Sequence, residues 1–383
     1  MIYFDQAASS FPKPASVANA MAEAVNEYAA NPGRGGHALA TRASQMIEST
    51  RELLKAFFHA PSKRHVWFYQ NATMALNQAL LGFPFQEGDH VVSTSFEHNS
   101  VRRPLEQLRQ RQGIEISYVE PNSTGLIEVE AIEKAFKRNT RLLVVSHGSN
   151  VTGAFVDIER IGKIAKTKKV PFLLDASQTA GKLRIEMDHA NISMLAFAGH
   201  KGLLGPQGTG ALIVAEDFQL KPLVYGGTGS YSELIDQPSQ WPDRYESGTL
   251  NTPGIAGLNA GIKYIVERGI DDIYEHEWQL TKQFLQGLQG MASIKEYGPS
   301  LEVKRVGVVS FQMEGLDSHE VATILDEHYQ IAVRAGLHCA PLAHDTLQTS
   351  ETGLVRVSFG PYNTAEEVDT LLTALGEIEQ AFY

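Results

Sequence analysis

Cysteine is scarce in this sequence, and long hydrophobic runs are missing. The only cysteine, Cys339, excludes an intramolecular disulfide and a zinc site built from several cysteines. No apolar run approaches the roughly 18–20 residues that a helix needs to cross a bilayer. The first residues, 1–6, also lack the basic segment and apolar core of a signal peptide. We therefore expect a cytoplasmic protein.

Positive charge is scarce as well. The chain has 33 Lys and Arg residues against 44 Asp and Glu residues, so its formal net charge is -11. An acidic surface repels polyanions, and we expect neither nucleic acid nor membrane among the partners. An anionic ligand would need positive groups gathered inside a cleft.

Short β-branched apolar runs alternate with amphipathic segments over much of the chain, without an internal repeat. The strand-like runs cover residues 65–69, 90–93, 141–146, 170–175, 194–198 and 211–214. The helical patterns between them cover residues 72–81, 101–111, 128–136 and 158–166. This alternation predicts an α/β fold whose sheet is mainly parallel and covered on both faces.

The rhythm changes near residue 255. Longer helical patterns at 255–267 and 273–288 precede strand-like runs at 306–313, 331–334 and 354–359, and a helical pattern at 365–381 ends the chain. We expect a smaller α+β domain here. The predicted division is a large α/β domain, 16–255, and a small domain formed by residues 1–15 and 256–383.

Ligands of open α/β sheets bind beyond the carboxyl ends of the strands, so the loops after the runs should carry the chemistry. Lys201 follows the run 194–198 and precedes a glycine-rich segment, and Asp175 ends the run 170–175. A lysine that forms a Schiff base and an acid that faces a pyridinium nitrogen are what pyridoxal phosphate (PLP) chemistry requires. A lone lysine beside glycines is usually an exposed surface residue. Its neighbours decide between these interpretations.

Polar residues follow the other runs too. Thr73 opens a helical pattern, whose free N–H groups could bind a phosphate or simply be capped. His98 could stack on a planar ring, act as an acid or base, or be structural. Asn150 could be a turn amide or a donor to a cofactor or substrate carboxylate. Gln178 could donate to a phenolate oxygen, and a carboxylate as buried as Asp175 needs a positive partner.

In combination these motifs resemble the class V, fold-type I PLP enzymes of the cysteine desulfurase family, in its SufS-like, selenocysteine-lyase-like branch. The similarity extends from residues 3–8 to residues 362–364. It implies a fold-type I PLP-dependent transferase, with a large, mainly parallel sheet domain and a smaller α+β C-terminal domain. It also implies pyridoxal 5'-phosphate as cofactor and a homodimer with shared active sites.

The resemblance assigns roles residue by residue. Lys201 would form the Schiff base and later move the substrate Cα proton, with His98 stacked on the ring. Arg356 would clamp the substrate carboxylate, assisted by Asn150; a bidentate guanidinium suits that task. Thr249, in the segment 246–251, would reach the phosphate of the partner subunit. The implied cofactor-binding residues are Ala72, Thr73, His98, Asn150, Asp175, Gln178, His200, Lys201 and Thr249.

Cys339 lies in residues 333–341, which are similar to the family's short Arg-x-Gly-x-x-Cys loop. That similarity implies that Cys339 takes sulfur as a persulfide, whereas a lone cysteine is otherwise often a small buried hydrophobe. Arg334 and His338 beside it would favour the thiolate. His338 and His344 could suggest a metal, but no convincing fourth ligand is present, and we predict none.

Two positions depart from the family pattern. Ala198 stands where a serine usually donates to the phosphate, so one cofactor hydrogen bond is lost or replaced by water. Gln6 stands where asparagine is usual, which affects the expected substrate entrance.

The predicted function is conversion of L-cysteine to L-alanine, with the sulfur passed from Cys339 to an acceptor such as a protein. One alternative is a selenocysteine lyase acting on L-selenocysteine, for which Cys339 would matter little. Another is a class V aminotransferase or β-lyase, in which Cys339 is incidental. The last is a silent scaffold that binds PLP or a partner protein.

Overall fold

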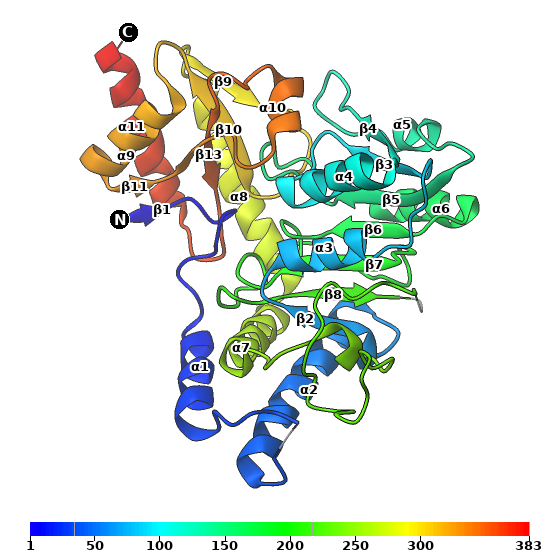
Figure 1. Cartoon of the computed structure of the whole chain (residues 1–383). Helices are drawn as coiled ribbons and strands as arrows, with labels where there is room; N and C mark the ends of the chain where they lie inside the picture. Colours follow the sequence, from blue (N-terminus) through cyan, green and yellow to red (C-terminus); the bar gives the residue numbers. More distant parts are fainter. Residues whose placement is uncertain (34, 216–217, 383) are drawn as a thin grey trace.

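The computed structural model describes residues 1–33, 35–215 and 218–382, and its core is a seven-stranded sheet, whose strands Figure 1 labels. The strand order is β2-β8-β7-β6-β5-β3-β4. Strands β4, β3, β5, β6 and β7 are parallel to one another, and β8 is antiparallel to both β7 and β2. The strands are β2 Val66–Tyr69, β3 His90–Thr94, β4 Glu115–Val119, β5 Thr140–Ser146, β6 Phe172–Asp175, β7 Met194–Ala198 and β8 Gly210–Val214. The predicted α/β fold is confirmed.

Both faces of this sheet are apolar, which explains why its strands appear in the sequence as continuous hydrophobic runs. Along β5, Leu142 and Val144 join the core under α3 (Ala72–Leu81) and α4 (Asn99–Gln112). Leu143 and Val145, which point to the opposite face, join the core under the other helices. Those helices are α2 Ala38–Phe58, α5 Val129–Lys134, α6 Ile158–Lys168 and α7 Thr252–Arg268. The first helix, α1 (Ala15–Glu27), packs on α7 through small residues such as Ala24 and Ala256.

The C-terminal third forms a second, antiparallel sheet of order β12-β13-β10-β9. Its strands are β9 Ile294–Tyr297, β10 Val308–Met313, β12 Arg334–Gly336 and β13 Leu354–Ser358. The helices of this part are α8 Ile270–Leu288, α9 Ser318–Tyr329, α10 Pro341–Leu347 and α11 Ala365–Phe382. Phe284 on α8, Leu325 on α9 and Leu371 on α11 share one core with Phe311 and Val357 of the sheet. The amino-terminal strand β1, Ile2–Tyr3, joins this part of the molecule (Figure 1).

One expected strand was wrong. The run 331–334 forms two strands, because its halves pair with different partners. Ile331–Ala332 (β11) is parallel to β1, and Arg334–Gly336 (β12) is antiparallel to β13. The domain boundaries at residues 16 and 255 stay a prediction. Within the described residues, no helix combines the length and the apolar character that a membrane crossing requires.

A buried ion pair ties the two sheets together. Lys182 Nζ lies 2.7 Å from Glu277 Oε2 and donates to the carbonyl of Phe359 at 3.2 Å. Lys182 follows β6, Glu277 belongs to α8, and Phe359 directly follows β13. The two side chains are only 7% and 1% exposed, so both charged groups have lost most of their hydration. The attraction between them compensates for that loss.

We expect Glu277→Ala to lower the free energy of unfolding by about 3–5 kcal/mol, because it leaves the Lys182 ammonium buried without its carboxylate. Chemical denaturation followed by circular dichroism measures the loss. Glu275→Ala is the matched control, since its pair with Lys304 is exposed to solvent and should contribute little. Equal losses in the two variants would contradict the assignment.

Candidate active site

A cavity of about 230 Å³ opens where the carboxyl ends of β5, β6 and β7 meet. Parallel neighbours place these ends along one edge, and Ser146 and Asp175, which end β5 and β6, are paired in register. The cavity therefore gathers residues from many separate loops. The predicted residues that line it are Ala72, Thr73, His98, Asn150, Asp175, Gln178, His200, Lys201 and Arg356.

Lys201 and Asp175 supply opposite charges to this cavity. Burial lowers the pKa of the Lys201 amine to about 8; Arg356 and Arg334 act in the same direction, and Asp175 opposes them. Asp175 is 5% exposed, and its Oδ1 accepts a hydrogen bond from the Ser177 backbone N–H at 2.9 Å. Among the described residues, no cation pairs with the Asp175 carboxylate within 4.0 Å. A buried carboxylate without a cation suits a positively charged ligand atom.

His98 stands at the start of α4 as its N-cap. Its Nδ1 accepts the backbone N–H of Ser100 at 3.0 Å, so the neutral ring carries its proton on Nε2. Burial, reinforced by the charge of Lys201, lowers the pKa of His98 to about 4. The hydroxyl of Ser100 also lies 2.7 Å from that of Thr73, which links the starts of α4 and α3. Sequence reasoning missed Ser100, although its position two residues after His98 was a usable signal.

The start of α3 can bind an anion. Asn71 caps the helix by accepting the Met74 N–H at 2.9 Å. The first N–H groups of a helix, here those of Ala72 and Thr73, have no partner within the helix, and the positive end of the dipole lies there. His200 also lines the cavity, and burial, with Lys201 and Lys13, lowers its pKa to about 4.

Arg356 is fully buried and held by groups from two distant segments. Its Nη2 donates to Asp5 Oδ1 at 2.7 Å, and its Nη1 donates to the carbonyl of Asn150 at 3.1 Å. Burial lowers its pKa, and Asp5 opposes this effect. Its Nε is buried and has no hydrogen-bond partner among the described residues. Sequence reasoning did not assign Asp5, although its motif at residues 3–8 was noted.

Cys339 is exposed and stands beside the cavity rather than in its lining. Its backbone and that of His338 are left-handed, with φ of 58° and 48°, conformations that few non-glycine residues adopt. Three bonds hold this loop: Asn99 N–H donates to the Cys339 carbonyl at 2.8 Å, Asn150 Nδ2 donates to the His338 carbonyl at 2.7 Å, and Arg334 Nη2 lies 3.7 Å from the sulfur.

The expectation that His338 favours the Cys339 thiolate was wrong. Burial, with the charge of Arg356, lowers the pKa of His338 to about 2, so its ring is neutral. Only Arg334 can supply positive charge to the sulfur from within this loop. Across the described residues, no cluster of three or more His, Cys, Asp or Glu side chains could hold a metal ion.

The two departures have different consequences. Ala198 ends β7 and lines the cavity, where its methyl group offers no donor. Gln6 is buried outside this lining, donates to the Phe11 carbonyl at 2.6 Å and accepts the Phe11 N–H at 3.0 Å. It therefore shapes the turn at residues 6–11. Gln178 faces the cavity while it donates to the Ala7 carbonyl at 3.0 Å.

Thr249 is exposed and does not line this cavity; it borders a separate one of about 180 Å³. The segment 246–251 that carries it is fixed at both ends. Glu246 makes a buried bidentate ion pair with Arg51, and Asn251 caps α7 by accepting the Gly254 N–H at 3.0 Å. A single chain therefore does not unite Thr249 with Lys201.

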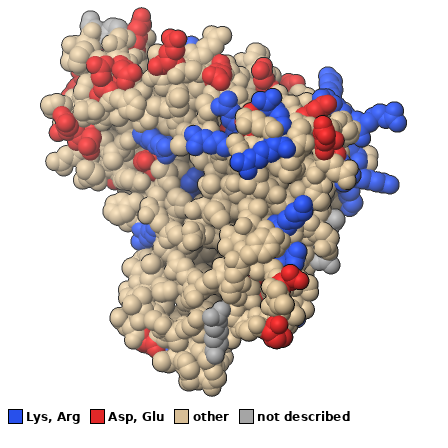
Figure 2. Space-filling view, in the orientation of Figure 1, with Lys and Arg blue, Asp and Glu red and all other residues tan. Residues whose placement is uncertain are grey.

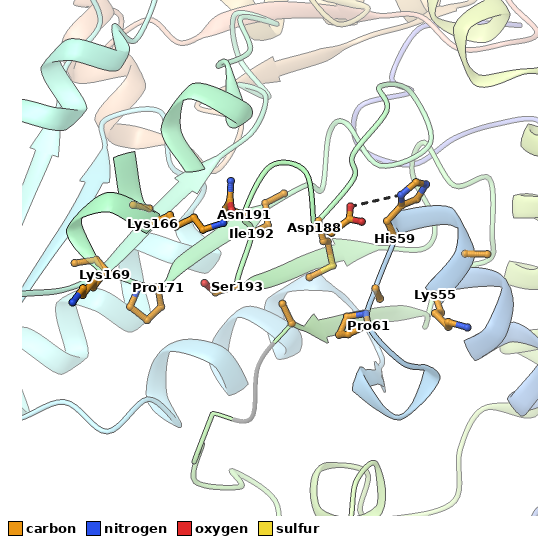
Figure 3. A pocket seen from close by; sticks show the side chains of 16 residues that line it. Lys55, His59, Pro61, Lys166, Lys169, Pro171, Asp188, Asn191, Ile192 and Ser193 are labelled. Carbon is orange, nitrogen blue, oxygen red and sulfur yellow. Dashed lines mark ion pairs between the residues drawn. The ribbon is translucent and has the colours of Figure 1, made fainter. Parts of the chain in front are cut away.

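A larger cavity, of about 820 Å³, lies at the opposite edge of the sheet (Figure 3). Lys166 and Lys169, at the C-terminal end of α6, border one side of it, and Lys55 and His59, at the end of α2, border the other. His59 pairs with Asp188 at 3.6 Å. No residue of the predicted site lines this cavity, so the chemistry belongs to the smaller one.

We expect the neutral Lys201 amine to form as the pH rises through about 8, so its reaction with an amine-directed reagent should reach half its maximum there. A free peptide lysine titrates near pH 10.4 and gives the comparison. Mass spectrometry of the cofactor-free protein after timed labelling measures the profile. Because Asp175 raises the pKa of Lys201, Asp175→Asn should move the profile to lower pH. A shift to higher pH would contradict this electrostatic picture.

The sequence and the fold match known proteins over nearly the whole chain. Residues 2–371 match the family described as Aminotransferase class-V. A probable cysteine desulfurase of Pyrococcus abyssi is 38% identical, covering 99% of this chain and 94% of that protein. One from Methanothermobacter thermautotrophicus is also 38% identical, covering 98% and 94%.

Solved structures of cysteine desulfurases have the same fold as this chain. The apo structure of cysteine desulfurase from Thermococcus onnurineus NA1 is 36% identical, with a TM-score of 0.92 over 99% of this chain and 95% of that one. The cysteine desulfurase CsdA from Escherichia coli is 26% identical, with a TM-score of 0.90 over 100% and 95%. The predicted fold-type I architecture is thereby confirmed. The chain belongs to the class V aminotransferase family, among relatives named cysteine desulfurases.

Proposed function

We propose that this protein is a PLP-dependent cysteine desulfurase that releases L-alanine from L-cysteine and captures the sulfur as a persulfide on Cys339. One observation carries the proposal: a buried amine with a lowered pKa, Lys201, shares a cavity with Asp175 and Arg356, and the Cys339 loop borders that cavity. The relatives named cysteine desulfurases support the same reaction.

The cavity fits PLP, on which enzymes of this family generally depend. Lys201 would hold the cofactor covalently, Asp175 would face its ring nitrogen, and His98 would cover its ring. The phosphate would be bound by the start of α3, the Thr73 hydroxyl and His200. Gln178 would face the phenolate oxygen, with Asn150 assisting. When bound, PLP draws electrons from the substrate Cα and so acidifies its C–H bond.

The chain's own groups would bind the substrate and move its proton. Arg356 would take the substrate carboxylate with the N–H groups of Nη1 and Nη2 that its bonds to Asn150 and Asp5 leave over. The neutral Lys201 amine would accept the Cα proton. A pKa near 8 leaves part of this amine neutral at physiological pH, whereas an ordinary lysine would remain protonated.

Cys339 would perform the sulfur transfer. Its thiolate, next to the Arg334 guanidinium, attacks the sulfur of the bound cysteine. The new sulfur–sulfur bond forms as the substrate carbon–sulfur bond breaks, and its electron pair stays with the carbon. That carbon is then protonated, and alanine leaves. The thiol is thus converted to a persulfide by the substrate alone, without an added oxidant.

The deciding experiment incubates the PLP-loaded protein with L-cysteine and a reductant and assays alanine and sulfide together. We expect equimolar release, and Cys339→Ser should lower it by about a hundredfold or more. A keto acid product would instead support an aminotransferase or β-lyase. If Cys339→Ser kept its activity on L-selenocysteine while losing that on L-cysteine, the lyase would be favoured. No turnover despite bound PLP would support a scaffold.

We also propose that the protein is a homodimer in which Thr249 contacts the phosphate held by the partner subunit. Thr249 is exposed, and Gly248 N–H bonds to the Gly227 carbonyl at 2.8 Å, within a loop rich in exposed apolar side chains. Tyr225 is 68% exposed, and Ile235 is completely exposed. Clustered apolar exposure of this kind marks a surface that another protein covers.

Mixing two inactive variants tests the shared site. Consider a heterodimer of one Lys201→Ala chain and one Thr249→Glu chain. One of its two sites combines the native Lys201 of the Thr249→Glu chain with the native Thr249 of the Lys201→Ala chain, and the other site carries both substitutions. We expect refolded equal mixtures to regain about a quarter of the wild-type activity, since half the dimers have one intact site out of two. If Thr249 served its own chain, no activity would return. Analytical ultracentrifugation checks that the dimers form.

A further inference from the structure

Helix α4 carries a basic surface in a chain that is acidic as a whole. It contains four arginines, Arg102, Arg103, Arg109 and Arg111, and one acidic residue, Glu106. Lys and Arg side chains gather over α4 in Figure 2. Arg109 pairs with Glu106 at 2.7 Å. Within the described part of the chain, no acidic group lies within 4.0 Å of the other three guanidinium groups.

Two of these arginines stand where the helix itself disfavours them. Arg102 and Arg103 are the fourth and fifth residues of α4, near the positive end of its dipole, and its first turn has no acidic residue. Neither side chain is buried, and Arg103 is exposed. Their position is therefore not explained by the stability of the helix. Such a placement leaves their charge available to a ligand.

The start of α4 adjoins the Cys339 loop. Asn99, the first residue of α4, donates its N–H to the Cys339 carbonyl at 2.8 Å. Arg334, which is half-buried, places its Nη2 3.7 Å from the sulfur. Leu337, two residues before Cys339, is 40% exposed and adds an apolar side chain to this surface. The exposed sulfur thus lies next to Arg334, and its loop adjoins the start of the helix that carries Arg102 and Arg103.

We propose that this surface, formed by Arg102, Arg103, Arg334 and Leu337, docks the sulfur acceptor, a protein whose reactive cysteine is surrounded by acidic side chains. The inference rests on the proposed function, because it concerns where the Cys339 persulfide goes. Charge complementarity speeds encounter and fixes orientation more than it adds affinity. It also selects among thiols, since a basic protein would be repelled.

The transfer of sulfur from the Cys339 persulfide to the acceptor conserves atoms and electrons. The acceptor thiolate attacks the outer sulfur of the Cys339 persulfide and forms a new sulfur–sulfur bond. The bond to Cys339 Sγ breaks, and the Cys339 thiolate leaves with its electron pair. The acceptor becomes the persulfide, and no oxidant or reductant is consumed. Arg334, next to the sulfur, is placed to stabilise the departing thiolate.

The test uses two synthetic peptides of equal length with one cysteine each, flanked by glutamates in one and by lysines in the other. Holoenzyme is charged once with L-cysteine without reductant, and persulfide transfer to each peptide is followed by mass spectrometry. We expect the glutamate peptide to react about tenfold faster at low ionic strength, with the advantage shrinking as salt screens the charges.

The double variant Arg102→Glu/Arg103→Glu should remove or reverse this preference, while the single-turnover release of alanine stays unchanged. Lys134→Glu/Arg138→Glu is the matched control: it makes the same charge change on exposed residues that precede the amino end of β5, at the opposite edge of the sheet. It should keep the preference.

Equal rates for the two peptides, or loss of the preference in the control, would overturn the docking surface. Failure of the proposed function would look different, because no alanine would be released and no persulfide would form on Cys339 in any variant. Circular dichroism of each variant shows whether it is folded.

Discussion

The burial of the Lys201 amine beside the Asp175 carboxylate is the constraint on which the rest of the site depends. An ammonium group loses hydration in this cavity, and two arginines repel it, yet one carboxylate attracts it. The result is an amine that exchanges its proton near physiological pH. Each contribution comes from a different strand end or sheet, so the chemistry requires both sheets to be in place. The buried pair of Lys182 and Glu277 helps to hold that arrangement.

Much of this arrangement could be predicted from the sequence, because local patterns determine it. The strand β7 and the helix α3 have the bounds that the apolar runs and the helical period predict. Strand ends of a parallel sheet converge on one edge, so polar residues after successive strands had to meet. That rule brought His98, Asp175 and Lys201 together without any knowledge of distances.

The parts that were missed have less distinctive patterns or depend on distant partners. Strand β4 lies at the edge of the sheet and is only partly buried, so it lacks the continuous apolar run of β5 or β6. Short strands such as β11 and β12 are defined by their partners rather than by their own residues. The neutrality of His338 also could not be predicted, because it results from the burial of the ring, which the local sequence does not reveal.

The first ten residues show why contacts between distant segments cannot be predicted from local sequence patterns. Asp5 holds Arg356 of the second sheet, and the Ala7 N–H donates to Ser358 at 2.9 Å. The Ala7 carbonyl accepts from Gln178, and the Ser10 N–H donates to the carbonyl of His200, the residue before Lys201. One short segment therefore joins the group proposed to bind the substrate carboxylate to the loop that carries the reactive amine.

This connection also explains why glutamine is accommodated at position 6. Its side chain is satisfied by Phe11 and lies 3.2 Å from Asn363, so it stabilises the turn that places the following residues. The side chain of Gln6 reaches Phe11 and Asn363 and does not line the cavity. Ala198, in contrast, lines the cavity itself, where the missing hydroxyl would leave the proposed phosphate binding to α3, Thr73 and His200. Of the two departures, only the one at Ala198 changes the proposed cofactor site directly.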